Sequence, residues 1–195
     1  TPKKSHYTFN LRDFSKIIQG ICLVEPYESF DGEALKRLWI HESSRVIMDR
    51  LLELEDKELF MKMLGEITVD VFDNTLDDLI GFLNPDKTDE GDLSAHRRLF
   101  FGNYLDINAA EPSYVEIEDV EGLVDKISEN LEVYNQESKT KMDLVLFVFA
   151  VEHISRIARV LSMPGGNMLL VGVGGSGRQS LSRLAAFMLE YDLKQ

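Results

Sequence analysis

The 195-residue sequence contains a single cysteine, Cys22, and this scarcity excludes an internal disulfide framework. One thiol fits a reducing compartment. Its place in the apolar run of residues 21–24 predicts a buried, unreactive side chain. With only five prolines and thirteen glycines, the sequence also lacks the composition of a long disordered linker. We therefore expect an ordered globular chain from a reducing compartment.

The sequence has no uninterrupted apolar run long enough to cross a membrane. Its most apolar stretch, residues 144–161, includes charged Glu152 and Arg156, which favours a helix in water. A net charge of −13 argues against nucleic acid as a partner. The first residues, Thr1 to Lys4, are polar, show no signal peptide and do not begin with Met. We expect a piece of a longer protein without a membrane span.

The first part of the sequence has the apolar spacing of helices. Asn10 is expected to cap a first helix that Gly20 ends. Further helices are expected over residues 33–54, over residues 57–72 with Asp56 as the cap, and over residues 75–83. One face of the first helix is lined, at helical spacing, by Leu11, Phe14, Ile17, Ile18 and Ile21.

Residues 84–92 are polar, turn-rich and without apolar periodicity, which marks a boundary. We therefore predict an all-helical domain over residues 1–91 and a second domain of mixed character over residues 92–195. In the second domain we expect an aromatic-rich docking segment (98–106), a short strand (113–118), helices (120–135, 142–163 and 178–189) and a buried parallel strand (167–171). The predicted fold class is predominantly α, with a truncated α/β part at the end.

A glycine-rich turn joins the predicted strand ending at Val171 to the helix beginning at Arg178. Glycines permit positive φ angles, which turn successive backbone N–H groups into one concavity. The helix N-terminus adds partial positive charge and free amides, so this arrangement binds phosphate. The predicted phosphate-binding residues are Gly172, Val173, Gly174, Gly175, Ser176, Gly177, Arg178, Gln179 and Ser180.

The first half of this stretch fits the G-x-x-x-x-G of a P-loop, whereas the second half departs from it. Arg178 stands where lysine is usual, and Gln179 stands where a serine or threonine hydroxyl holds Mg²⁺. Ser180 is one residue late, about 100° further round the helix. We therefore expect nucleotide binding with weakened Mg²⁺ affinity and slow or absent hydrolysis.

Two other interpretations of the loop remain open. Gly172, Gly174 and Gly177 also fit the dinucleotide fingerprint, which needs an acidic residue about twenty residues further on, at the end of a second strand. The third interpretation is a tight turn without a ligand. The four histidines show no metal-ligand spacing.

Several segments together resemble dynein heavy chains, in particular the axonemal branch. The stretch His6 to Asp13 and the stretch Trp39 to Leu51 are similar to the helical lid of the third AAA+ module of the motor ring. Glu152 to Ile157, followed by the loop from Gly172 to Leu181, resembles the beginning of the fourth module. The Arg-Gln-Ser departure is itself typical of axonemal dyneins in that module.

The resemblance implies that Arg12 is the sensor-2 arginine, which reaches from the lid to the nucleotide of the third module. The alternative for Arg12 is an ion pair with Asp13 or Glu25. It also implies ATP or ADP as ligand in the fourth module's Walker A loop, with neighbouring modules, other dynein subunits and microtubules as partners, in the cytoplasm and the ciliary axoneme. The expected role is regulatory binding and coupling between modules. Competing functions are a midasin- or MoxR-like remodelling ATPase, and an all-α interaction module with a structural glycine turn.

Overall fold

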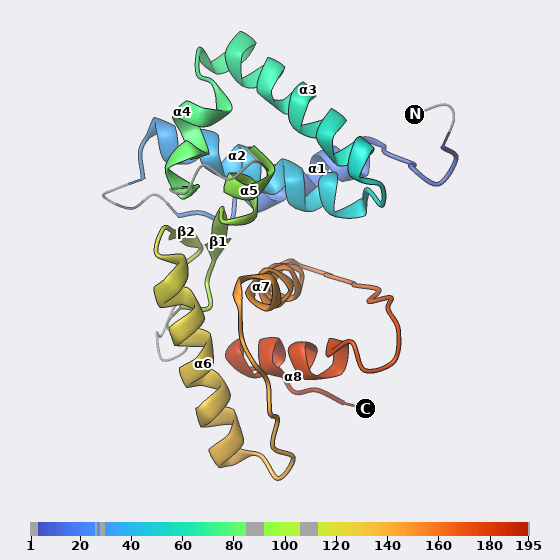
Figure 1. Ribbon diagram of the computed structural model, residues 1–195, viewed down its shortest axis with the longest axis vertical. Coiled ribbons are helices and arrows are strands. Elements are labelled where there is room, and N and C mark those ends of the chain that lie inside the picture. Colours follow the sequence, from blue (N-terminus) through green and yellow to red (C-terminus); the bar gives the residue numbers. More distant parts are fainter. Residues whose placement is uncertain (1–3, 26, 28–29, 85–91, 106–112, 195) are drawn as a thin grey trace. The chain divides into compact units, whose positions relative to one another are not determined.

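The computed structural model describes residues 4–25, 27, 30–84, 92–105 and 113–194 (Figure 1). The chain divides into two compact units, Thr1–Leu99 and Phe100–Gln195. Helices dominate both units, and the described residues contain one two-stranded sheet. The predicted class, a helical lid followed by the first part of a P-loop domain, is confirmed.

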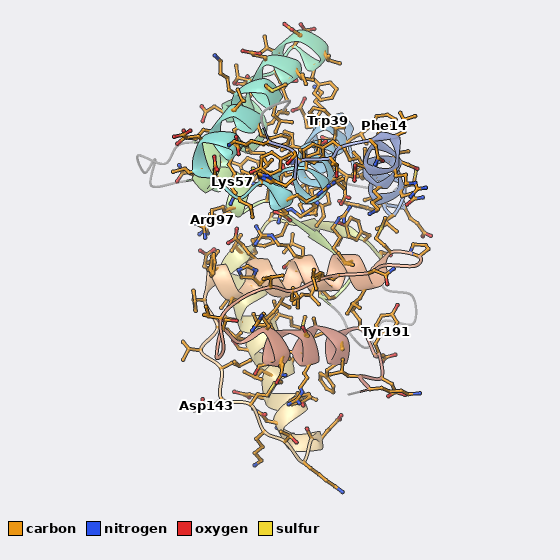
Figure 2. The ribbon with its side chains drawn as sticks, turned by 90° about the vertical axis from the view of Figure 1, so that its right-hand side faces the viewer. Phe14, Trp39, Lys57, Arg97, Asp143 and Tyr191 are labelled. Carbon is orange, nitrogen blue, oxygen red and sulfur yellow. The ribbon has the colours of Figure 1, made fainter. Side chains whose placement is uncertain are left out.

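The first unit is all helical in its described residues. Its helices are α1 (Leu11–Ile21), α2 (Gly32–Val46), α3 (Leu54–Phe72), α4 (Leu76–Ile80) and α5 (Asp92–Arg97), with short 3₁₀ turns η1 (Met48–Arg50) and η2 (Gly81–Leu83). The ring of Trp39 in α2, labelled in Figure 2, meets the ring of Phe72 at the end of α3 edge to face. The two ring centroids are 5.3 Å apart.

The start of α1 is confirmed as predicted. The side chain of Asn10 accepts the N–H of Arg12 at 2.8 Å, and Asp13 Oδ2 accepts the N–H of Asn10 at 2.8 Å. These two bonds form a capping box, which satisfies amides that the helix itself leaves unpaired. Gly20 does not end the helix: it lies inside it and is buried.

Only part of the apolar face of α1 is buried. Ile17 is buried, but Leu11, Phe14 and Ile18 are 85%, 61% and 43% exposed. Within the first unit α1 packs against α2, so only the narrow strip around Ile17 and Gly20 is covered. The prediction of a buried Cys22 is wrong. Cys22 follows the last turn of α1, and its side chain is exposed.

Two predicted helix boundaries also differ from the structure. Residues 33–54 do not form one helix, since α2 ends at Val46. Ser44 Oγ donates to the carbonyl of Ile40 at 2.8 Å, and two β-branched residues follow at 46 and 47; both features weaken a helix. Asp56 does not cap α3. It lies in the first helical turn and accepts hydrogen bonds from Lys4 and Tyr7 instead.

The second unit pairs strand β1 (Phe100–Gly102) antiparallel with β2 (Val115–Ile117), with Phe100 opposite Ile117. Helices α6 (Val120–Glu137), α7 (Val148–Ser162) and α8 (Arg178–Met188) complete it. The predicted short strand is confirmed by β2. The predicted docking of the aromatic segment is confirmed because Phe101 and Tyr104 are almost fully buried. The core lies between the strands and the three helices, with Leu123, Ile154 and Leu184 at its centre.

The helix predicted over residues 142–163 begins six residues later, at Val148. The side chain of Asn135 donates to the Met142 carbonyl at 2.9 Å and accepts the Met142 N–H at 2.7 Å. Because these bonds use both backbone groups of Met142, the segment up to Phe147 stays extended. Figure 2 labels Asp143 in this segment.

The buried parallel strand predicted over residues 167–171 is the clearest error. The segment forms no sheet pairing with the described residues, and Leu169 and Val171 are 86% and 84% exposed. A parallel strand is buried only when strands and helices cover both of its faces. The apolar run therefore specifies a strand only together with neighbouring strands.

Candidate phosphate-binding site

The loop before α8 takes a backbone shape that only glycine adopts without strain. Gly175 and Gly177 have φ angles of +78° and +75°. A Cβ atom at either position would be strained, whatever space surrounds it. Gly177 is also the N-cap of α8, and its carbonyl accepts the first helical hydrogen bond, from Leu181, at 2.9 Å. The amides of the first turn of α8 therefore face the loop without an intrahelical acceptor.

An open cavity of about 710 Å³ lies at this helix end. Its lining residues are Leu144, Leu170, Gly174, Gly175, Ser176, Gly177, Arg178, Gln179, Ser180, Ser182 and Leu193. The structure thus gathers the predicted residues from Gly174 to Ser180 around one cavity. Gly172 and Val173 lie outside that lining and contact Arg178 instead.

Sequence reasoning missed Leu144, which comes from the extended segment before α7. From Asp143 to Val148 the residues alternate between exposed and half-buried, the pattern of an extended chain. Nearly all of them are apolar, so hydropathy alone does not reveal this alternation. Leu144 gives the cavity an apolar wall beside the glycine-rich loop.

Arg178 is the cation of this site, and its side chain folds back over the loop. Its Nη2 donates to the carbonyl of Val173 at 3.0 Å. A methyl group built on Gly172 would lie 3.4 Å from Arg178 Cδ and 3.5 Å from Nε, so the arginine stem passes over this glycine. Gln179 is exposed, whereas Ser180 is half-buried. The nearest hydroxyl after Arg178 is therefore that of Ser180, two residues later, and not that of the next residue as in a regular P-loop.

Arg12, the other predicted site residue, lies in the first turn of α1 in the first unit and is exposed. Asp13 uses one carboxylate oxygen for Arg50, at 2.7 Å, and the other for the N–H of Asn10. In the part of the chain that the structure describes, the Arg12 guanidinium forms no ion pair with Asp13 or Glu25.

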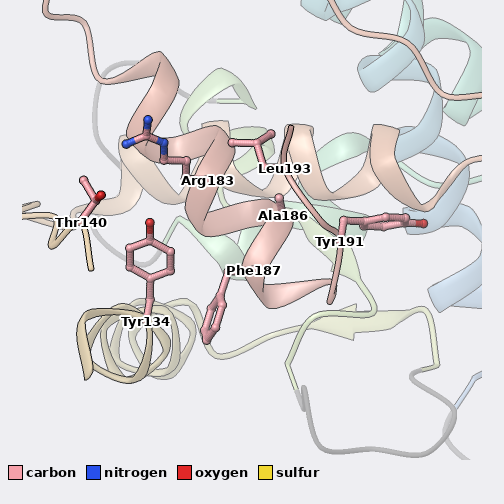
Figure 3. Close-up of a pocket in the computed structure, with 7 residues that line it drawn as sticks. All are labelled: Tyr134, Thr140, Arg183, Ala186, Phe187, Tyr191 and Leu193. Carbon is pink, nitrogen blue, oxygen red and sulfur yellow. The ribbon is translucent and has the colours of Figure 1, made fainter. Parts of the chain in front are cut away.

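Helix α8 carries a second arginine that points elsewhere. Arg183 is five residues after Arg178, about 140° further round the helix. It lines a smaller pocket of about 260 Å³ with Tyr134 and Phe187, whose rings meet edge to face at 5.3 Å (Figure 3). Arg178 and Arg183 thus serve different surfaces of one helix.

Among the described residues, no cluster of three or more His, Cys, Asp or Glu side chains is arranged to hold a metal ion. No described helix is long and apolar enough to span a membrane.

Comparison with known proteins agrees with this geometry. Residues 142–195 match the family described as "P-loop containing dynein motor region D4", and residues 1–82 match the AAA+ lid domain. The chain is 46% identical over 195 residues to human dynein axonemal heavy chain 3, and 45% identical over 196 residues to its mouse counterpart. It is 42% identical over 200 residues to human dynein axonemal heavy chain 12.

The first part of the chain is therefore a lid domain of the AAA+ class, and its last part is a P-loop segment of that class. The chain belongs to the dynein heavy-chain family, of the axonemal type. All of the chain is covered in these alignments, but it spans only 5–6% of the length of these relatives. The family matches favour the dynein interpretation over a midasin- or MoxR-like ATPase and over a stand-alone helical module.

Proposed function

We propose that residues 172–180 bind the phosphates of ATP or ADP as a regulatory site in a dynein motor ring. The observation that carries this proposal is the loop itself. Two glycines with positive φ lead into the N-terminus of α8, beside an open cavity that Arg178 lines. Backbone amides, a helix end and one cation are the groups that P-loops use for phosphate.

Arg178 and Gln179 favour binding over turnover. Hydrolysis of a phosphoanhydride needs charge neutralisation by Mg²⁺ and a cation together. Gln179 offers the metal only a neutral amide oxygen, and its side chain is exposed. We expect Mg²⁺ to bind weakly here and the chain not to hydrolyse ATP alone.

In the whole protein we assign residues 1–91 to the lid of the third AAA+ module and residues 92–195 to the beginning of the fourth. Arg12, exposed in the first turn of α1, would reach the nucleotide of the third module. The chain would then connect two neighbouring nucleotide sites, and coupling between such sites is reciprocal in free energy. The activity that this serves is ATP-driven movement along microtubules in the cytoplasmic axoneme of cilia, with adjacent modules and other dynein subunits as partners.

A pair of glycine substitutions tests phosphate binding. Gly177→Ala strains the loop at φ +75°, and Gly165→Ala imposes similar strain at φ +65° in the turn after α7, outside the cavity lining. Titration of the 195-residue chain with a fluorescent ADP analogue should show affinity about tenfold lower for Gly177→Ala, since left-handed strain costs about 1–2 kcal/mol.

Gly165→Ala should change the affinity by less than about twofold, and circular dichroism should show both variants folded. Equal losses in the two variants would mean that the loop geometry is not what binds phosphate. An unaltered chain that fails to bind the analogue at millimolar concentration would also reject the proposal.

A further inference from the structure

We infer that the Arg178 guanidinium competes with phosphate for the loop, so that a bound phosphate displaces it from the Val173 carbonyl. This inference rests on the proposed function, because it concerns regulation of the same site. Nη2 of Arg178 then has two alternative acceptors, the Val173 carbonyl and a bound phosphate. The residue acts both as an internal competitor and as the cation of the site.

The contact joins the two ends of the loop. Arg178 Nη2 donates to the Val173 carbonyl, 3.0 Å away and five residues earlier in the chain. The stem crosses Gly172, where a methyl group would lie 3.1 Å from Ser176 Oγ as well as close to Arg178 Cδ. Glycine at 172 therefore leaves room for the arginine to fold back.

The two acceptors differ in strength. Val173 offers a neutral carbonyl, whereas phosphate offers charged oxygens that a planar guanidinium can bind in pairs. A charge-assisted hydrogen bond to an anion is about twice as strong as one to a neutral group. Phosphate should therefore win the competition, and the contact with Val173 lowers its apparent affinity without abolishing binding.

The size of this reduction follows from the population of the folded-back state. The apparent affinity falls by the fraction of chains whose loop is open. Breaking one exposed hydrogen bond to a neutral acceptor should reduce the apparent affinity for phosphate by about twofold to tenfold. Side chains at an exposed site change rotamer within nanoseconds, so the contact affects affinity and does not limit the association rate.

Nuclear magnetic resonance of the 195-residue chain, with labelled carbonyls and arginine side chains, tests the inference directly. In the free chain, Arg178→Met should shift the ¹³C resonance of the Val173 carbonyl, because the donor is lost. Arg183→Met is the matched control: it removes the same charge from the same helix but lines the other pocket, and should leave Val173 unchanged. If Arg178→Met does not shift Val173, the contact does not exist and the inference is wrong.

The second step is titration of the unaltered chain with inorganic pyrophosphate. The Val173 carbonyl should move toward its position in Arg178→Met, while the Arg178 guanidinium nitrogens shift as they engage phosphate. If pyrophosphate shifts the loop amides but leaves the Val173–Arg178 contact intact at saturation, the inference alone fails. If no loop resonance responds to pyrophosphate, both the proposed function and the inference fail.

Discussion

The guanidinium of Arg50 lies 2.7 Å from Asp13 Oδ1, and this pair ties the turn after α2 to the start of α1. Arg50 also donates to the carbonyl of Thr8 at 3.0 Å and lies 4.6 Å from the centre of the Phe9 ring. Asp13 is thus engaged by Arg50 and by the N–H of Asn10, and the neighbouring Arg12 is exposed.

Replacing Arg50 by methionine should lower the free energy of unfolding of the first unit by about 1 kcal/mol. This value is the upper end for a partly exposed ion pair, to which the contact with Phe9 adds a little. Trp39, the single tryptophan, lies in α2, so its fluorescence during urea unfolding reports on this unit. Lys16→Met, which removes an exposed charge from α1 of the same unit, is the control and should change stability by less than about 0.5 kcal/mol. Equal changes in the free energy of unfolding for the two variants would contradict a stabilising role of the Arg50–Asp13 pair.

The first unit should lose stability in acid through Asp56. Hydrogen bonds from Lys4 and then Tyr7 hold the pKa of Asp56 below its ordinary value of 3.8. A carboxylate with a depressed pKa contributes stability that is present above the ordinary value and is lost as pH falls through the folded value. The urea concentration at the midpoint of unfolding, followed by Trp39 fluorescence, should therefore decrease when the pH is lowered below about 4.

Lys4→Met should make this acid dependence shallower, because it removes the largest cause of the Asp56 shift. Asp31 and Asp78, whose pKa values are also lowered, keep part of the dependence, through hydrogen bonds from Ala34 and Thr75. The control is Lys57→Met, beside Asp56 on α3. Identical pH profiles for the Lys4 and Lys57 variants would contradict the assignment.

Arg12 should matter for nucleotide and not for the stability of the chain. In the full-length heavy chain, Arg12→Met should weaken nucleotide binding at the preceding module by about tenfold, the loss of one charge-assisted hydrogen bond. In the 195-residue chain the same change should alter the free energy of unfolding by less than about 0.5 kcal/mol, because the side chain is exposed. Lys16→Met, one turn later and also exposed, is the matched control for both measurements. An equal loss of affinity in the two variants would mean that Arg12 acts only through its charge and does not contact the nucleotide.

The loop should gain Mg²⁺ dependence when its two departures from the P-loop pattern are reversed. The double change Arg178→Lys with Gln179→Thr supplies the flexible ammonium and the metal-binding hydroxyl. Nucleotide affinity with Mg²⁺ should exceed that with chelator by about tenfold in the double variant, and by less than about threefold in the unaltered chain. Calorimetric titration with and without chelator measures both ratios. An unchanged ratio would show that these two residues do not explain the weak metal site.

Local rules of the sequence predicted the features that depend on neighbouring residues. Asn10 caps α1 as predicted, because a cap needs only the next three residues. The glycine loop and the start of α8 were predicted for the same reason. Apolar spacing predicted α1 to α4 in their order, although not the end of α2, and the alternation at 113–118 predicted the short strand β2; α5 was not predicted.

Features that depend on distant residues were not predictable. Asp56 has the composition of a cap, yet Lys4 and Tyr7, about fifty residues away, engage its carboxylate. Met142 has the pattern of a helix, yet the Asn135 side chain holds it extended. The sequence shows Arg178 in place of lysine, but only the folded loop shows its contact with Val173.

The sequence by itself determined the helical lid, the glycine-rich loop before α8 and the resemblance to dynein, because caps, turns and motifs are encoded within a few consecutive residues. The tertiary structure alone decided which apolar residues are buried. Leu11, Phe14 and Leu169 have the hydropathy of core residues and are exposed here. Burial is a property of the surfaces that meet, and the identity of a single residue does not specify its neighbour across space.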